Sequence, residues 1–250
     1  MGFSGYISEI IYNDGLKADS YLNELPLIKH LKRENRIKLS SDITFFIGEN
    51  GTGKSTLLEA LAVSFGFNAE GGSRNFNFST NATHSELHEH LTLGKKAYPK
   101  DGFFLRAESV YNVATNLEEL DRIPAAAPKL TGGYGGKSLH HQSHGESFLS
   151  IVKNRFFGQG LYILDEPEAA LSPNRLLSLM LEIKRLRDKN SQFIIATHSP
   201  ILMTFPGAEI FEFSENGLSK TDYKSTDHYN ITRRFLEDPE RMLGYLFEAE

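Results

Sequence analysis

Short apolar runs alternate with longer segments in which apolar residues recur at helical spacing. Residues 42–47 form a short apolar run that ends at a glycine, which is typical of a buried strand. In residues 54–65, apolar side chains recur three and four positions apart, as at Leu57 and Leu61, which predicts a helix. A strand, a glycine-rich loop and a helix therefore follow one another directly.

The same alternation continues along the chain. Further strands are predicted at 6–12, 36–40, 102–107, 161–164, 192–197, 210–213 and 218–223, the last two as a hairpin. Further helices are predicted at 85–93, 111–120, 144–157 and 173–188, with two short helices in 229–247 separated at Pro239. This alternation predicts an α/β fold with a mainly parallel sheet. Residues 121–142 contain two prolines and four glycines, and we expect a mobile surface loop there.

Composition narrows the class of protein. The chain has 250 residues, no cysteine and a net charge of −5. The length suits one domain, and the absence of cysteine excludes disulfides, thiolate zinc sites and cysteine nucleophiles. The net charge is not that of a protein that coats nucleic acid. No apolar run approaches the roughly 18 residues of a membrane helix, so we expect a cytoplasmic protein without membrane insertion.

The strongest motif lies between the first buried strand and its helix. Residues 48–55 read Gly-Glu-Asn-Gly-Thr-Gly-Lys-Ser and fit the phosphate-binding pattern G-x-x-x-x-G-K-[ST]. Glycines let backbone N–H groups turn towards phosphate oxygens, and the helix N-terminus adds a positive dipole. We expect Lys54 to reach the β- and γ-phosphates and Ser55 to ligate magnesium. The predicted nucleotide-binding positions are Gly48, Asn50, Gly51, Thr52, Gly53, Lys54, Ser55 and Thr56.

A second motif places two carboxylates at the end of a buried strand. Residues 161–166 read Leu-Tyr-Ile-Leu-Asp-Glu. Asp165 suits a magnesium shell, and Glu166 can orient or deprotonate an attacking water. An apolar strand ending in Asp-Glu also occurs as a simple helix cap, but a phosphate-binding loop upstream favours catalysis.

Two further segments bear on a triphosphate. His198 follows a predicted buried strand and is placed to contact a γ-phosphate. Ser143 and Gly145 open a predicted helix, which makes a second anion site. One chain does not need two such sites for one triphosphate, whereas two chains facing each other do.

Together these segments resemble the ATP-binding cassette (ABC) ATPases, in the branch that holds the SMC and RecF proteins. Residues 48–55 match the Walker A motif and 161–166 the Walker B motif. Residues 143–146 resemble the LSGGQ signature, with His144 in place of a glycine and Glu146 in place of the glutamine. Residues 170–173 resemble the D-loop, His198 the switch histidine, and Glu108 stands where the Q-loop carries glutamine.

Residues 71–78, 104–109 and 143–149 further resemble a family of stand-alone bacterial ATPases labelled AAA family. The resemblance implies a single ABC-type P-loop domain over residues 1–250. It has a mainly parallel core sheet, an antiparallel N-terminal portion and a helical signature subdomain at about 84–158.

It also implies ATP and Mg²⁺ as cofactors and a homodimer that forms around ATP. Ser143, Gly145 and Glu146 would contact the partner's nucleotide. Glu166, His198 and Glu108 would be catalytic, with Ser55, Asp165 and Glu108 near the metal.

Three biological roles of such an ATPase stay open. The chain is an ATPase that transmits closure to an unidentified protein or nucleic-acid partner, the nucleotide-binding subunit of a membrane transporter, or a DNA-repair or anti-phage ATPase. Glu108 and the altered signature argue against the transporter, and the absence of long coiled-coil segments argues against DNA tethering over distance.

Weaker candidates have ordinary explanations. The spacing of His84 and His88 is not that of a zinc motif,. Arg74, close to Phe76 and Phe78, suits a surface arginine beside core aromatics better than a base-stacking site. The basic residues at 29–33 and 233–241 are expected on solvated faces.

Overall fold

Most of the chain belongs to one layered α/β arrangement. The computed structural model describes residues 5–73, 85–122, 132 and 138–248. The strands are β1 (Ile7–Tyr12), β2 (Arg36–Lys38), β3 (Ile43–Gly48), β4 (Leu91–Lys95), β5 (Asp101–Arg106), β6 (Gly160–Asp165), β7 (Gln192–Ala196), β8 (Glu209–Ser214) and β9 (Gly217–Thr221). The α-helices are α1 (Pro26–Glu34), α2 (Lys54–Phe65), α3 (Val110–Arg122), α4 (His144–Arg155), α5 (Pro173–Arg187), α6 (Asp227–Glu237) and α7 (Pro239–Phe247).

The strands form two sheets. The larger has the order β5-β6-β7-β3-β8-β9, with parallel pairing up to β8 and the antiparallel β8–β9 hairpin at its edge. The smaller is antiparallel, in the order β2-β1-β4. The prediction of a mainly parallel core sheet with an antiparallel N-terminal portion is confirmed.

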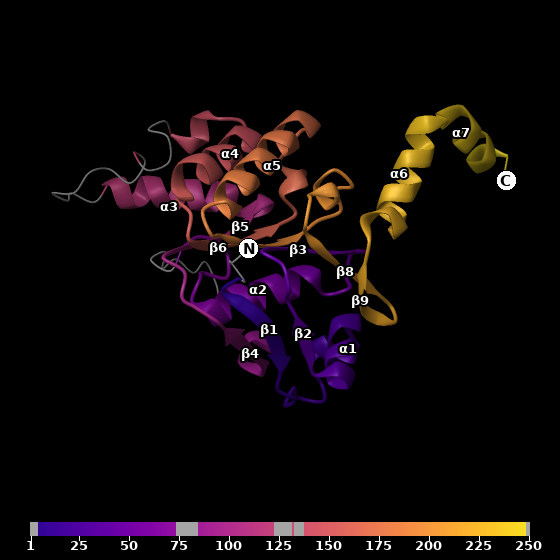
Figure 1. Cartoon of the computed structure of the whole chain (residues 1–250). Coiled ribbons are helices and arrows are strands. Elements are labelled where there is room, and N and C mark those ends of the chain that lie inside the picture. Colours follow the sequence, from indigo (N-terminus) through magenta and orange to yellow (C-terminus); the bar gives the residue numbers. More distant parts are fainter. Residues whose placement is uncertain (1–4, 74–84, 123–131, 133–137, 249–250) are drawn as a thin grey trace.

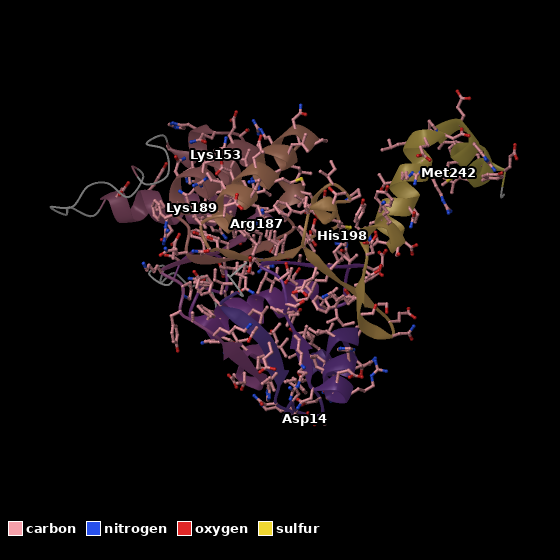
Figure 2. The ribbon with its side chains drawn as sticks, in the orientation of Figure 1. Asp14, Lys153, Arg187, Lys189, His198 and Met242 are labelled. Carbon is pink, nitrogen blue, oxygen red and sulfur yellow. The ribbon has the colours of Figure 1, made fainter. Side chains whose placement is uncertain are left out.

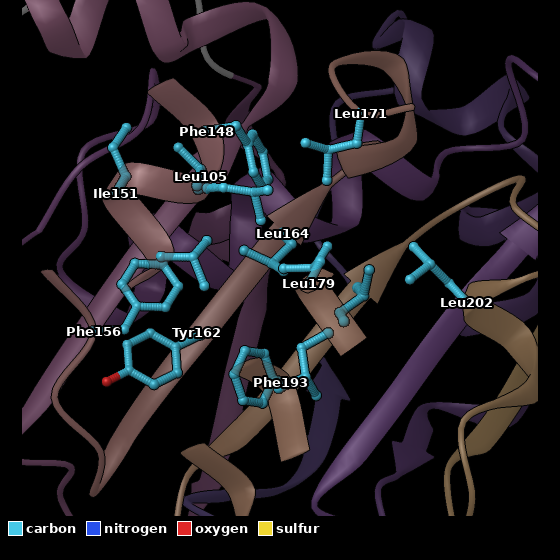
Figure 3. Packing of buried hydrophobic residues seen from close by; sticks show 14 of the residues in the cluster. Leu105, Phe148, Ile151, Phe156, Tyr162, Leu164, Leu171, Leu179, Phe193 and Leu202 are labelled. Atoms are coloured by element: carbon cyan, nitrogen blue, oxygen red, sulfur yellow. The ribbon is translucent and has the colours of Figure 1, made fainter. Parts of the chain in front are cut away.

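Each face of the large sheet has its own apolar core. Along β3, Phe45 packs into the cluster under α3, α4 and α5, while its neighbour Phe46 packs into the cluster that contains α1, α2 and β1. Successive side chains on a strand point to opposite faces, and a sheet covered on both faces needs apolar residues at every position. Figure 1 shows these two layers above and below the sheet. Figure 3 shows the first core, where the rings of Phe156 and Tyr162 stack 4.1 Å apart.

The buried amide of Gln192, at the start of β7, ties the small sheet to the large one. Its Oε1 accepts the backbone N–H groups of Tyr6 and Ile7 at 2.7 and 2.8 Å, and its Nε2 donates to the carbonyl of Ile7 at 2.8 Å. A buried amide with these groups satisfied fixes the relative position of the two strands.

Two sequence predictions need correction, and one helix was missed. Residues 85–93 are not a helix: a 3₁₀ turn at Glu86–His90 leads into β4, which pairs with β1. Leu87 and Leu91 have helical spacing, but pairing with β1 overrides this local preference. Consequently the range 84–158 is not a helical unit throughout, because β4 and β5 belong to the two sheets. Helix α1 was not predicted, and its basic residues at 29, 32 and 33 are exposed, as expected for a solvated face.

The predicted loop at 121–142 lies largely outside the described residues. At its two ends, α3 extends to Arg122 and a 3₁₀ turn spans Leu139–His141. Arg74 and His84 also lie outside the described residues, so the interpretations given for them stay predictions.

The C-terminal helices α6 and α7 stand apart from the layered body (Figure 1). Neither helix contains a buried residue. The exposed large apolar side chains on this pair include Ile231, Leu236, Tyr245, Leu246 and Phe247. Among the described helices, none is both long enough and apolar enough to cross a bilayer.

Candidate functional site

The candidate site lies where three neighbouring parallel strands end. Strands β6, β7 and β3 are adjacent in the large sheet, and the carboxyl ends of parallel strands share one edge. The loop at 49–53 follows β3, Glu166 follows β6, and residues 197–200 follow β7. Segments far apart in the sequence therefore meet at one edge of the large sheet.

The loop between β3 and α2 depends on glycines for two different reasons. Gly51 and Gly53 have positive φ angles of 80° and 103°, which side chains rarely adopt. A Cβ atom on Gly48 would lie only 2.3 Å from the carbonyl oxygen of Phe213 on β8. The first glycine of the motif is thus required by the neighbouring strand, and the later ones by the turn.

Lys54, the first residue of α2, is 4% exposed. Its ammonium group donates to the carbonyl oxygens of Gly48 and Glu49 at 2.7 and 2.8 Å, folding back over the loop. Burial lowers the pKa of Lys54, and the carboxylates of Glu166 and Asp165 oppose that shift. The Lys54 ammonium group therefore fixes the loop at 49–53 and lies near the carboxylates of Glu166 and Asp165.

Ser55 and Asp165 bring a hydroxyl and a carboxylate together. Ser55 Oγ donates to Asp165 Oδ1 at 3.1 Å, and Asp165 is 5% exposed. Burial raises the pKa of Asp165 to about 6, whereas the Arg106 guanidinium and the Ser55 hydroxyl act to lower it.

A cavity of about 180 Å³ opens beside this pair, lined by Ser55, Arg106, Ala107, Glu108, Asp165, Glu166 and Ala169. Hydroxyl and carboxylate oxygens are ligands that Mg²⁺ accepts, usually together with waters and substrate phosphates, so the pair fits this metal. Among the described residues, no cluster of three or more His, Asp or Glu side chains could hold a metal alone.

Glu166 has a strained backbone. Its φ and ψ are 48° and 53°, in the left-handed region, which costs a non-glycine residue about 1–3 kcal/mol. Its Oε1 lies 3.5 Å from Nε2 of His198. Such strain is common where a side chain must face a reacting group, and here it aims a carboxylate at the switch-histidine position.

A second histidine holds the ring of His198. Nδ1 of His198 lies 3.1 Å from Nε2 of His228, on α6. Burial lowers the pKa of His198, with a further lowering from the Lys54 charge, which favours the neutral ring near pH 7. Figure 2 shows His198 close to the start of α6. The sequence analysis missed His228, because nothing in its local pattern marks it.

Glu168 supports the same loop. Its carboxylate accepts the backbone N–H of His198 and, at 2.8 Å, the hydroxyl of Thr197. Burial raises the pKa of Glu168, while these hydrogen bonds act to lower it. The carboxylates of Glu166 and Glu168 thus both contact the loop that follows β7. In this segment the sequence analysis considered Asp165 and Glu166 but not Glu168.

The predicted signature segment is built around its own cap. Glu146 Oε2 accepts the backbone N–H of Ser143 at 2.9 Å and its hydroxyl at 2.8 Å, the N3-to-N-cap half of a capping box. Arg175, on α5, donates to Ser143 Oγ and to Glu146 Oε1, each at 3.0 Å. A Cβ atom on Gly145 would lie 2.6 Å from the carbonyl oxygen of Ala170, so only glycine fits there.

Two departures from the ABC pattern have structural partners. His144 Nε2 lies 2.7 Å from the carbonyl oxygen of Ala107, which links α4 to the Q-loop position. Glu108, with a side chain that is 72% exposed, pairs with Arg106 at 2.6 Å. The sequence analysis did not select Arg106. Its place at the end of β5, two residues before Glu108, was the available signal.

Comparison with known proteins gives two family matches. Residues 27–118 match a family described as "AAA domain", and residues 140–204 match one described as "AAA domain, putative AbiEii toxin, Type IV TA system".

Several curated ATP-binding proteins are similar over most of the chain. A galactose/methyl galactoside import ATP-binding protein of Photobacterium profundum is 28% identical over 205 residues, covering 73% of this chain and 39% of that protein. An uncharacterized ABC transporter ATP-binding protein of Haemophilus influenzae is 27% identical over 222 residues, covering 82% of this chain and 83% of that protein. This chain spans about two fifths of the length of the sugar-import relatives.

Solved structures agree on the fold. cbiO1 from Clostridium perfringens, part of the ABC transporter complex cbiONQ, aligns with a TM-score of 0.51 at 16% identity, covering 97% of this chain and 99% of that one. This chain is similar in sequence to ABC-type ATP-binding proteins and shares their fold. The ABC resemblance drawn from its motifs is confirmed. The narrower placement in the SMC and RecF branch stays a prediction.

The structure brings Lys54, Ser55, Asp165, Glu166 and His198 to one sheet edge. The signature segment is separate from it. Within the described residues, no hydrogen bond or ion pair joins residues 143–146 to the loop at 48–55. The geometry therefore divides the predicted site residues into two groups.

Proposed function

We propose that this domain binds and hydrolyses ATP, and that two copies close head to tail around two ATP molecules. The observation that carries the proposal is the convergence of Ser55 on Asp165 and of Glu166 on His198 at one sheet edge. These contacts supply a hydroxyl, two carboxylates and an imidazole beside a loop suited to phosphate.

Each side chain has a role in the proposed reaction. Lys54 releases its two loop carbonyls and donates to the β- and γ-phosphates. Ser55 and Asp165 would hold Mg²⁺, which, when bound, neutralises charge on the phosphates. Glu166 accepts a proton from the attacking water, and the neutral ring of His198 donates a hydrogen bond to the γ-phosphate.

The second copy follows from the separation of the signature segment from the phosphate-binding loop. Ser143, Gly145 and Glu146 open a helix whose dipole favours anions, yet they contact residues of α5 rather than the loop at 48–55. Placed opposite the loop of another copy, this helix end would cover the γ-phosphate. A two-fold arrangement gives both copies the same contact.

The decisive test combines oligomeric state with turnover. In a Glu166→Gln variant, ATP and Mg²⁺ should convert the 28.1-kDa monomer into a stable dimer, and hydrolysis should stop. The amide keeps the shape of the carboxylate but cannot accept the proton. Light scattering after size exclusion measures the mass, and phosphate release measures turnover.

A matched pair of variants tests the signature segment. Ser143→Arg in the Glu166→Gln background should keep the protein monomeric, because the new cation faces Arg175 and the other copy. Ser150→Arg, lower on α4, should leave the dimer intact. If the Glu166→Gln variant stays monomeric at saturating ATP, the proposed dimer around two ATP molecules is refuted. If that variant hydrolyses ATP at the wild-type rate, the proposed role of Glu166 is refuted.

A second candidate is the ATP-binding subunit of a membrane transporter, which the names of the curated relatives favour. In both candidate functions, the closure of two copies around ATP is transmitted to a partner. Capture of partners from native cells by ATP-locked Glu166→Gln protein separates them. An integral membrane protein as the main stoichiometric partner supports the transporter, and a water-soluble protein or a nucleic acid supports the first proposal.

A further inference from the structure

The candidate metal site already contains a positively charged side chain. Arg106 ends β5 and lies opposite Asp165, the last residue of β6, in the parallel register. Its guanidinium contacts three carboxylates: Glu108 at 2.6 Å, Glu59 on α2 at 3.4 Å and Asp165 at 3.4 Å. The Arg106 side chain is 21% exposed and the Asp165 side chain 6%.

The contacts of Arg106 are uneven. The short one is to Glu108, whose side chain is 72% exposed, whereas the contact to buried Asp165 is long. The Nε atom that faces Asp165 is buried and makes no hydrogen bond within the described residues. Charge attraction therefore holds the guanidinium near Asp165 without a closed hydrogen bond, while Glu108 provides a tight anchor on the solvent side.

Charge balance explains why a cation is needed there. Arg106 is the one basic residue among those lining the 180 Å³ cavity, which Asp165, Glu166 and Glu108 also line. Carboxylates that converge without a cation repel one another and pay a desolvation penalty. A divalent ion bound at Asp165 would supply that charge instead, and two cations close to one buried carboxylate oppose each other.

We propose that Arg106 is a resident counter-cation that competes with the metal of the nucleotide complex for Asp165. In the nucleotide-free chain it neutralises Asp165 and Glu59. When metal and nucleotide bind, it withdraws from Asp165 and stays paired with Glu108, which thereby serves as the anchor of Arg106 rather than as a metal ligand. This inference rests on the proposed binding of ATP with a divalent metal at Ser55 and Asp165.

The test is the affinity of Mn²⁺ for the protein saturated with ADP, measured by electron paramagnetic resonance. Removing a competing cation should tighten Mn²⁺ binding by about tenfold in Arg106→Gln. A purely supporting role for Arg106 would instead weaken it, so the sign of the change decides. In an Asp165→Asn background, Arg106→Gln should no longer tighten Mn²⁺ binding, because the arginine and the metal both act on the Asp165 carboxylate.

The other end of β5 offers a matched control. Arg155 pairs with Asp101, the first residue of β5, at 2.7 Å and is 19% exposed. Arg155→Gln removes a comparable ion pair away from the site and should leave Mn²⁺ affinity unchanged. Arg106→Lys keeps the charge but cannot span all three carboxylates, so it should give a smaller gain and provides a test if Arg106→Gln does not fold.

Unchanged or weaker Mn²⁺ binding in the folded Arg106 variants overturns the inference, as does a gain that survives Asp165→Asn. Those outcomes leave the proposed function standing if the wild-type protein binds ATP with Mg²⁺ and the Glu166→Gln variant dimerises. Absence of nucleotide binding by the wild-type protein would instead overturn the proposed function itself.

Discussion

The buried, ionised carboxylate of Asp165 should lower the free energy of unfolding of the nucleotide-free chain. Burial raises the pKa of Asp165 from 3.8 to about 6, even with Arg106 and Ser55 opposing the shift. One pKa unit corresponds to about 1.4 kcal/mol, so ionised Asp165 costs about 3 kcal/mol of folding free energy at pH 7. Asp165→Asn has the shape of the protonated acid without its charge. It should therefore raise the free energy of unfolding by about that amount.

The effect has a defined pH window. An acid with a raised folded-state pKa binds its proton more tightly when folded, so stability falls as pH rises from 3.8 to about 6,. The advantage of Asp165→Asn should be full above pH 6, shrink through this window and vanish below pH 3.8. For a chain of this size, about 3 kcal/mol corresponds to about 6–12 °C in melting temperature.

Thermal unfolding of the nucleotide-free protein in the presence of a metal chelator measures this difference. Asp101→Asn is the matched control, because Asp101 accepts hydrogen bonds from Arg155 and Tyr162, each at 2.7 Å. Weakening those bonds should lower the melting temperature. The reasoning is refuted if Asp165→Asn melts at or below the wild-type temperature at pH 7, or if its advantage persists unchanged near pH 3.5.

Three other changes test separate parts of the molecule. Lys54→Ala should weaken ATP binding about 100-fold or more by removing a charge-assisted contact to the phosphates, and titration calorimetry that shows unchanged affinity would contradict the assignment of the loop. His228→Ala should lower kcat about tenfold with little change in ATP affinity, because the ring of His198 loses the group that orients it; a change confined to affinity would argue for a different role. Glu209→Gln should lower the free energy of unfolding by about 1–3 kcal/mol in urea titrations, because the buried carboxylate accepts hydrogen bonds from Ser40 and Thr44 at 2.6 and 2.9 Å,. Hydrogen bonds hold the pKa of Glu209 below its ordinary value, so this loss should be present at pH 7 and disappear as pH falls through the acid range.

The sequence predicted what depends on short stretches of chain. The strand at 42–47, its loop and the helix at 54–65 were predictable because period and glycine placement are local properties. The same holds for the helix break at Pro239, which the structure has between α6 and α7. The mainly parallel pairing of the large sheet followed from the alternation of strands and helices.

The sequence could not predict what long-range contacts decide. Residues 85–93 have helical spacing, yet pairing with β1 makes residues 91–93 part of strand β4. Glu59, Arg106 and His228 reach the site from α2, β5 and α6, and they lie outside the Walker A, Walker B and signature motifs. Their contacts depend on how those elements pack, which a local pattern does not encode.

The position of β3 within the large sheet has a consequence for the order in which the molecule forms. β3 is flanked by β7 and β8, which come from the last quarter of the chain, and β8 supplies the carbonyl that closes over Gly48. At about 5–20 residues per second, a ribosome needs about 10–30 s to reach β8 after completing β3. During that interval the phosphate-binding sequence exists without the sheet that shapes it. A nascent chain or fragment ending before residue 209 would therefore carry the motif without β8, and it would expose the edge of β3 that pairs with β8 to chaperones and proteases.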